Sequence, residues 1–178
     1  MKKTLLLLLG TGAYNIYHDE HERFDSVFEV AGSCVGGFNK ELSRLFGADD
    51  DVSVFYETDA WKYILNKYKQ KGVENIIVLN CLAGSSSKNL EYILQASKSL
   101  ELVFFLSAVV PFTCEGDSRY DKALQVVSDL VEESVSKINL SFNDDMNKMF
   151  ETELVADVFR KFHKQVCDEI LEMNCEVV

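Results

Sequence analysis

Proline, positive charge and long apolar runs are scarce in this sequence, and each shortage excludes something. There is one proline in 178 residues, which fits an ordered globular chain better than a disordered one. Lys and Arg total 18 against 29 Asp and Glu, for a formal net charge of −11. Without clustered basic residues, the chain lacks a surface for nucleic acid or for an anionic membrane. No apolar run is long enough to span a bilayer.

Cysteines are few and scattered. Their number is odd and no two are close in sequence, which excludes a disulfide framework and a Cys-x-x-Cys metal site. They are best explained as buried free thiols in a reducing compartment, so we expect a cytoplasmic protein. The five are Cys34, Cys81, Cys114, Cys167 and Cys175.

The N-terminus has two interpretations. Two lysines followed by Leu5–Leu9 resemble the start of a secretory signal, for which Gly10–Ala13 would be the cleavage site. A buried strand of five leucines that ends in a glycine turn explains the same residues, and we favour it.

Strand and helix patterns alternate along the rest of the chain. This alternation predicts a single α/β domain over residues 1–178, with a three-layer, mostly parallel, Rossmann-like sheet. Residues 15–23 are polar and predict a loop or a short helix. Apolar or β-branched runs predict strands at 27–31, 52–56, 76–79, 102–110 and 138–142. Apolar residues at helical spacing predict helices at 42–46, 58–68, 90–97, 120–131 and 155–170.

Three predicted strand exits carry turn sequences suited to a ligand. Ligands of parallel sheets bind beyond the carboxyl ends of the strands. The turns are the glycine-rich Gly32–Asn39, the serine-rich Ala83–Ser87 and the proline-led Pro111–Gly116. Glycine allows backbone N–H groups to approach phosphate oxygens, and a helix that starts there adds the favourable end of its dipole.

The segment Val110–Arg119 resembles the Pro-Phe-x-x-Glu-Gly-x-x-Arg motif of FtsZ, in the tubulin/FtsZ superfamily. Other parts of the chain follow in family order, and the resemblance covers roughly residues 25 to 173. Gly32–Asn39 resembles the first glycine-rich loop, and Val52–Ala60 the second strand with its Asn-Thr-Asp-Ala motif. Asn143-Asp144 resembles the Asn-Asp turn, and Ala156-Asp157 the start of the central helix.

The resemblance implies that GDP or GTP binds at these turns. Glu115 and Arg119 match family positions near the ribose and base, and Asn143 and Asp157 match positions that recognise the guanine edge. The full implied set is Gly32, Cys34, Gly36, Gly37, Asn39, Gly84, Ser85, Ser86, Ser87, Pro111, Glu115, Arg119, Asn143 and Asp157.

Simple structural roles explain the same residues one at a time. Glu115 and Arg119 are four apart at a helix start, so they can form an ordinary ion pair. Asn143 can cap the next segment, and Asp157 can be a solvated helix residue.

Several departures from the family pattern affect the expected function. The fourth loop, Leu82–Lys88, has one glycine where the family has a glycine-rich run. The family's third strand and its γ-phosphate loop have no counterpart between Gly72 and Ile76. Leu5–Asn15 matches nothing in the family, and we expect it to fill the vacated edge of the sheet.

The sequence also stops just after the helix that resembles the family's central helix. The family's second domain carries the acidic residue that activates water on a neighbouring subunit's nucleotide. We therefore expect little or no hydrolysis, no tightly held Mg²⁺, and a cell-division or cytoskeletal role.

Two other functions compete with nucleotide binding. A nucleotide-free relative would act through a protein partner or as a homo-oligomer, and it would show an exposed apolar patch. A small enzyme would use Cys81, which ends a strand and precedes a helix start that can lower its pKa.

Overall fold

The computed structural model describes residues 3–32, 58–133 and 135–176. Two predicted elements, the helix at 42–46 and the strand at 52–56, therefore lie outside the described residues. So do four of the predicted site residues, Cys34, Gly36, Gly37 and Asn39.

The described part of the chain is built on a five-stranded sheet with the order β2-β1-β3-β4-β5. Every neighbouring pair of strands is parallel, which confirms the predicted α/β class with a parallel sheet. The strands are β1 (Lys3–Leu9), β2 (Glu29–Gly32), β3 (Val73–Cys81), β4 (Val103–Val110) and β5 (Lys137–Phe142).

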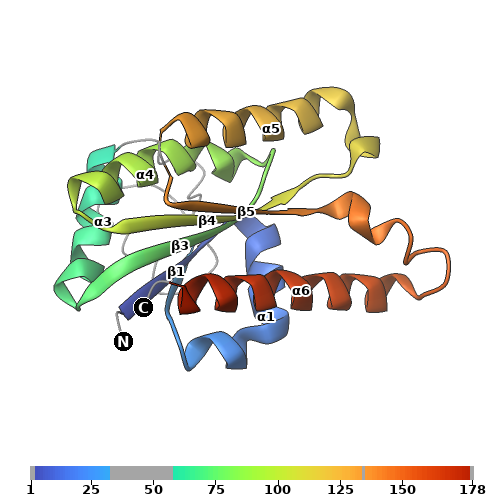
Figure 1. Cartoon of the computed structure of the whole chain (residues 1–178), viewed down its shortest axis with the longest axis horizontal. Helices are drawn as coiled ribbons and strands as arrows, with labels where there is room; N and C mark the ends of the chain where they lie inside the picture. Colours follow the sequence, from blue (N-terminus) through green and yellow to red (C-terminus); the bar gives the residue numbers. More distant parts are fainter. Residues whose placement is uncertain (1–2, 33–57, 134, 177–178) are drawn as a thin grey trace, which may run out of the picture.

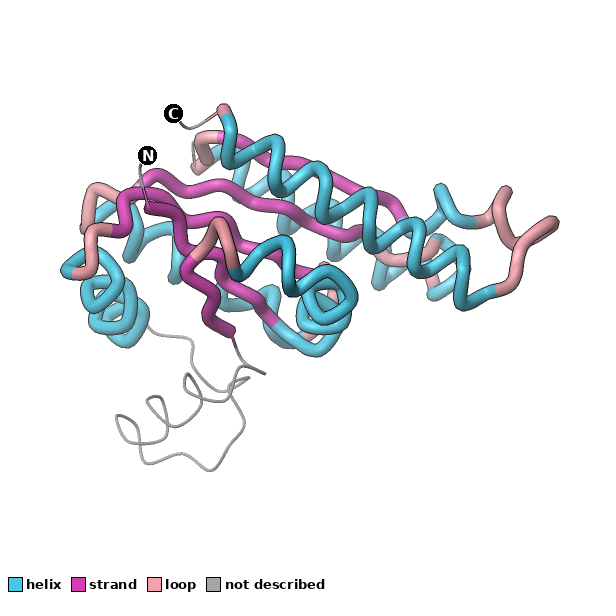
Figure 2. The backbone as a smooth tube through the Cα atoms, turned by 90° about the horizontal axis from the view of Figure 1, so that it is seen from below, coloured by secondary structure: helices cyan, strands magenta, loops and turns pink. Residues whose placement is uncertain are grey.

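Helices cover both faces of the sheet and complete the predicted three layers (Figures 1 and 2). One face carries α3 (Thr58–Gln70), α4 (Leu90–Ser99) and α5 (Asp117–Glu132), and the other carries α1 (Gly10–Asp25) and α6 (Val155–Cys175). Short 3₁₀ segments follow three of the strands: η2 (Ser85–Asn89), η3 (Thr113–Glu115) and η4 (Asn143–Met146).

The leucine strand β1 lies inside the sheet, between β2 and β3, and not at its edge. Each leucine from Leu5 to Leu9 is at most 2% exposed, because helices cover both faces of the strand. Our expectation that Leu5–Asn15 fills a vacated edge is therefore wrong. A run of five leucines is what a strand needs when neither of its faces meets water.

The polar segment that follows β1 is helical. We expected a loop or a short helix at residues 15–23, but they belong to the sixteen-residue helix α1. Ala13, Ile16 and Phe24 are the buried residues of this helix and pack into the core beneath α6. Among the described residues, no helix is both long and apolar enough to cross a membrane.

Candidate functional site

A buried asparagine joins the exits of β1 and β3. Asn80 has no exposed surface. Its Nδ2 donates to the carbonyl oxygen of Leu9 and to Ser86 Oγ, both at 3.0 Å, and its Oδ1 accepts a hydrogen bond from Ser87 Oγ at 2.8 Å. A buried polar group whose partners are all present holds a unique geometry. Asn80 thus ties the end of β1 to the turn after β3.

Two glycines after β1 allow this close contact. Gly10 has φ +86°, and a Cβ built on it would lie 2.8 Å from Ser86 Oγ. A Cβ on Gly12 would lie 2.6 Å from Cys81 Sγ. Both positions therefore exclude larger side chains. The backbone of residues 10–12 forms the first turn of α1, where helical N–H groups have no intrahelical acceptor.

The serine side chains in the turn after β3 mostly form hydrogen bonds within the protein. Ser86 and Ser87 both bond to Asn80, and Ser87 is 5% exposed. Asn89 Nδ2 donates to the Ser86 carbonyl oxygen at 3.3 Å, and its Oδ1 accepts from Trp61 Nε1 at 3.2 Å. Gly84 caps η2 at its start, and Ser85 is exposed. The two hydroxyl groups nearest to β1 are thus engaged within the protein.

The exits of β4 and β5 are held by surface contacts. Pro111 is buried, and Glu115 Oε1 accepts the Phe112 N–H at 3.0 Å. Glu115 Oε2 pairs with Arg119 Nη1 at 3.1 Å, which is the local ion pair that their spacing allows. The Thr113 N–H donates to Asp144 Oδ1 at 3.2 Å and joins the two exits.

A pocket of about 240 Å³ opens at this edge of the sheet, between α1 and α6. Of the predicted site residues that the structure describes, Asn143 is the one that lines it. It is joined by residues from α1, from the ends of β3 and β4, and from α6: Gly12, Asn15, Ile16, Cys81, Val109, Phe159, Phe162 and His163. Apolar side chains make up much of the wall, and Asn15 and Asn143 add amide groups.

Aromatic rings extend along the α6 side of this pocket. The ring centroids of Phe112 and Phe150 are 6.4 Å apart, and those of Phe150 and Phe159 are 6.1 Å apart. Phe159 meets the ring of His163 edge-on at 6.1 Å. Nδ1 of His163 lies 2.6 Å from Asp19 Oδ2, and this contact holds α1 and α6 together beside the pocket.

Two residues implied by the resemblance lie elsewhere. Asp157 does not line the pocket, and its Oδ1 accepts a hydrogen bond from Arg160 Nη1 at 2.7 Å. Gly32 ends β2 beside Leu8, and a Cβ on Gly32 would lie 2.5 Å from the Leu8 carbonyl oxygen. The lack of a side chain at Gly32 is therefore required by the packing of strand on strand.

Cys81 is not an activated nucleophile. Burial raises the pKa of its thiol to about 11, from the ordinary 9.0. A thiol with this pKa is almost fully protonated at neutral pH, whereas catalytic cysteines have lowered values. The raised pKa therefore does not favour the interpretation of Cys81 as the nucleophile of a small enzyme, although the residue lines the pocket described above.

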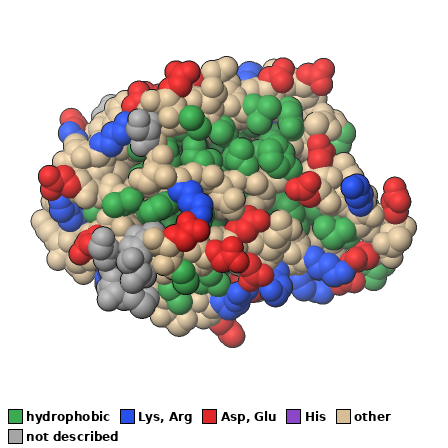
Figure 3. All heavy atoms as spheres, in the orientation of Figure 1, with side chains coloured by type: hydrophobic (Ala, Val, Ile, Leu, Met, Phe, Trp, Pro, Cys, Tyr) green, Lys and Arg blue, Asp and Glu red, His purple; other side chains and the backbone are tan. Residues whose placement is uncertain are grey.

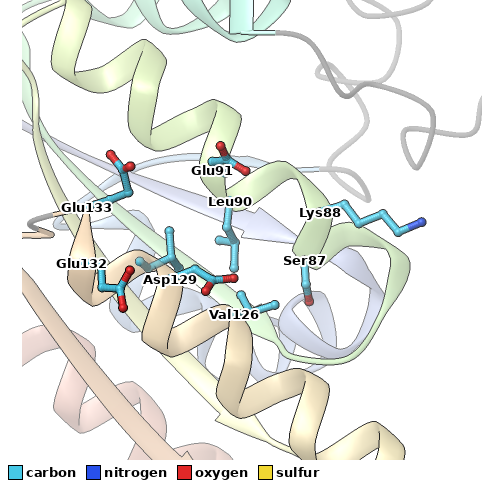
Figure 4. A pocket seen from close by; sticks show the side chains of 9 residues that line it. Ser87, Lys88, Leu90, Glu91, Val126, Asp129, Glu132 and Glu133 are labelled. Carbon is cyan, nitrogen blue, oxygen red and sulfur yellow. The ribbon is translucent and has the colours of Figure 1, made fainter.

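A second hollow, of about 340 Å³, lies between α4 and α5 (Figure 4). Leu90, Val126 and Leu130 form its floor. Its rim carries four carboxylates and one lysine: Glu91, Asp129, Glu132, Glu133 and Lys88. Four carboxylates repel phosphate, so this groove is not a site for a nucleotide.

Comparison with solved structures agrees with this geometry. The chain is similar to CetZ from Methanosaeta thermophila strain DSM 6194, with a TM-score of 0.64 and 16% identity over 97% of this chain. It is also similar to the empty FtsZ dimer of M. jannaschii, with a TM-score of 0.62 and 11% identity over 93% of this chain. The chain therefore has the fold of these CetZ and FtsZ structures.

A third similar structure is the GTPgS-bound protofilament of CetZ2 from Haloferax volcanii, with a TM-score of 0.57 and 14% identity over 94% of this chain. The FtsZ-like chain spans only 54%, 52% and 57% of the lengths of these three proteins. No family model matches the sequence, and no curated protein does. At these identities the likeness establishes the fold.

Among the described residues, the glycine turn closest to the pocket is Gly10–Gly12, which the site predicted from the sequence does not include. A signal for it was present, since a continuous apolar strand runs directly into Gly-Thr-Gly. Phe159 and His163 were also missed. Their spacing of four residues on the last helix is typical of core packing, so it does not single them out as site residues.

Proposed function

We propose that this FtsZ-like domain binds a guanine nucleotide at the edge of the sheet where β3, β4 and β5 end. The observation that carries the proposal is the pocket between α1 and α6, which adjoins the first turn of α1. An anion at a helix N-terminus is stabilised by the positive end of the helix dipole. The phosphates would lie along Gly10–Gly12.

The size of the pocket suggests which part of the nucleotide it holds. Pockets that enclose whole drug-sized ligands have volumes of about 300–1,000 Å³, and this one has about 240 Å³. It therefore suits the base, with the ribose and phosphates outside. The Asn143 amide offers both a donor and an acceptor to a base edge, and Phe159 supplies an aromatic wall.

We also propose that hydrolysis is slow or absent. Among the described residues that line the pocket there is no Asp or Glu to activate water and no Lys or Arg to stabilise a charged transition state. The part of the chain that the structure describes contains no group of three or more His, Cys, Asp or Glu placed to hold a metal ion. The proposal therefore includes no protein-held Mg²⁺.

The wider role follows from the fold alone. We propose a cytoplasmic protein with a cell-division or cytoskeletal role, because the similar solved structures are CetZ and FtsZ proteins.

A second candidate function is a nucleotide-free relative that acts through protein contacts. The engagement of the Ser86 and Ser87 hydroxyls with Asn80 favours it, because these groups are then not available to phosphate. It is also favoured by exposed apolar side chains on α5, described below.

Thermal unfolding with nucleotide distinguishes the two functions. Millimolar GDP or GTP should raise the melting temperature, because a ligand that binds only the native state stabilises it by about 2.7 kcal/mol at a hundred times its Kd. For a domain of this size, each kcal/mol corresponds to about 2–4 °C. An unchanged melting temperature with both nucleotides would overturn the binding proposal in favour of the nucleotide-free one.

Two variants test where the nucleotide lies. Asn143→Ala should reduce the GDP-induced shift, because it removes the amide that faces the pocket. Asp157→Ala is the matched control on α6, and it should leave the shift unchanged, since Asp157 pairs with Arg160 outside the pocket. The reverse result would place the base against Asp157, as the sequence resemblance implies.

A further inference from the structure

The edge strand β5 is exposed in a way that the other long strands are not. It is last in the sheet order and pairs only with β4 among the described strands. Five of its six residues are half-buried, whereas β3 and β4 are almost wholly buried. In a parallel ladder, the backbone groups on the outer side of such a strand point away from the sheet.

The usual protections of a sheet edge are missing from β5. It contains no proline, and its register with β4 runs without a bulge from Lys137 to Phe142. Its single charged residue, Lys137, stands at the first position and forms an ion pair with Glu176. Proteins commonly use proline, bulges or central charges to keep an edge from pairing with another chain.

Apolar side chains flank the outer edge of β5. Ile138, Leu140 and Phe142 alternate along the strand and pack, half-buried, against the core on the α5 side. The neighbouring helix adds Leu124, which is 36% exposed, and Val131, which is 61% exposed. Figure 3 shows hydrophobic side chains gathered over the face between α5 and β5. Contiguous patches of this kind mark interaction surfaces.

We propose that this surface binds a second copy of the chain, with the two β5 strands pairing antiparallel about a twofold axis. A single extended peptide would satisfy the strand edge but would leave Leu124 and Val131 in water. A second copy brings its own α5, so the apolar flanks of both helices are covered together. An isologous interface needs only one self-complementary patch, which β5 and α5 provide.

The side-chain pattern selects one register. Residues that oppose each other in an antiparallel pair lie on the same face of the sheet. The apolar residues of one β5 must therefore oppose the apolar residues of the other β5. All three apolar residues are paired when Leu140 lies on the axis and Ile138 opposes Phe142 of the other copy. The polar row does not interfere, because Asn139 and Ser141 donate to Glu169 of their own chain on the α6 side.

The first experiment measures mass in solution by sedimentation, without nucleotide. The protein at submillimolar concentration should sediment as a dimer of twice the 20.2 kDa chain. Leu140→Lys places two like charges on the axis and should weaken dimerisation at least about tenfold. Leu154→Lys is the control, because Leu154 is 75% exposed and lies away from β5. A monomeric wild-type protein, or an equal loss in the control, would overturn the proposal.

Cross-linking tests the register in a chain that retains its fold. Opposed residues of antiparallel strands have Cα atoms about 4.5–5.5 Å apart, within the range of a disulfide. With Cys114 and Cys175 replaced by serine, Leu140→Cys should therefore form a covalent dimer on oxidation. Ile138→Cys is the matched control, since the two thiol positions would be separated by four residues, about 13 Å along the strand.

Cross-linking of Ile138→Cys in place of Leu140→Cys would contradict the proposed pairing. The dimer does not depend on the proposed nucleotide site, so the two proposals can fail separately. A monomeric Leu140→Lys protein that keeps its GDP-induced shift would show that they are independent.

Discussion

The exits of β1 and β3 and the exits of β4 and β5 lie on the same edge of the sheet, but they are held in opposite ways. At the first pair, Asn80 is fully buried and its amide makes three hydrogen bonds within 3.0 Å. At the second pair, Glu115 and Arg119 form an ion pair whose side chains are 29% and 52% exposed. Buried hydrogen bonds hold the ends of β1 and β3 together, whereas partly exposed contacts hold the ends of β4 and β5.

The residues that most resemble FtsZ are thus not the residues that hold the site in shape. The motif that most resembles FtsZ, around Glu115 and Arg119, rests on contacts that are individually weak. The part of the site that the core holds in place, around Asn80 and Gly10, carries the less familiar sequence. A motif thus indicates a resemblance, whereas burial indicates which residues maintain the shape of the site.

The largest expected effect comes from breaking the buried network. Asn80→Leu keeps the approximate volume but removes all three hydrogen bonds, leaving the Leu9 carbonyl and the Ser87 hydroxyl without this partner. We expect a loss of about 3–4 kcal/mol in the free energy of unfolding, measured by urea denaturation.

Arg119→Ala is the matched change at the other pair of exits. It should alter the free energy of unfolding by less than about 0.5 kcal/mol, because exposed ion pairs contribute little. If both variants lose the same stability, the contrast between the two pairs of exits is wrong.

Two glycine variants test the same comparison, with an expected stability loss of intermediate size. Gly10 and Gly72 have nearly the same backbone angle, φ +86° and +88°, but a Cβ on Gly72 would meet nothing within 4 Å. Gly72→Ala should therefore cost only backbone strain, about 1–2 kcal/mol. Gly10→Ala should cost about 1 kcal/mol more, because its Cβ meets Ser86 Oγ.

The difference between these two glycine variants measures how tightly the turn after β1 contacts the turn after β3. Equal melting temperatures for the two variants would show that Ser86 moves away without cost. In that case, the buried network would not hold this side chain in place.

A further prediction concerns alkaline pH. In the unfolded chain the Cys81 thiol ionises near its ordinary pKa of 9.0, whereas burial raises the pKa in the folded chain to about 11. Between these values, the unfolded state releases a proton that the folded state keeps. The free energy of unfolding should therefore fall as pH rises, by up to about 1.4 kcal/mol per pH unit from this thiol.

Cys81→Ala removes this contribution and should flatten the loss of stability between pH 9 and pH 11. Part of the slope will remain, because burial also raises the pKa of the Cys167 thiol, to about 12. Below pH 8 the variant and the wild type should differ by a constant amount. An unchanged slope above pH 9 would mean that the Cys81 thiol is open to water.

Much of the fold could be predicted from local patterns. The apolar run at 76–79 lies within β3, the run at 102–110 matches β4 except for its first residue, and the helix predicted at 155–170 lies within α6. These segments are long and regular, so their neighbours have little influence on their conformation. The site was harder to predict, because residues 12, 143, 159 and 163 meet only after α6 packs over the sheet.

By itself, the sequence determined the α/β alternation and the parallel sheet, because apolar periodicity reflects which faces of each element are buried. The tertiary structure alone decided that Leu5–Leu9 lies inside the sheet, that Gly10–Gly12 and not Asp157 borders the pocket, and that β5 is an open edge. A run of leucines specifies burial but not the neighbours that provide it. Neighbours are set by contacts between residues far apart in the chain, and these contacts leave no local pattern.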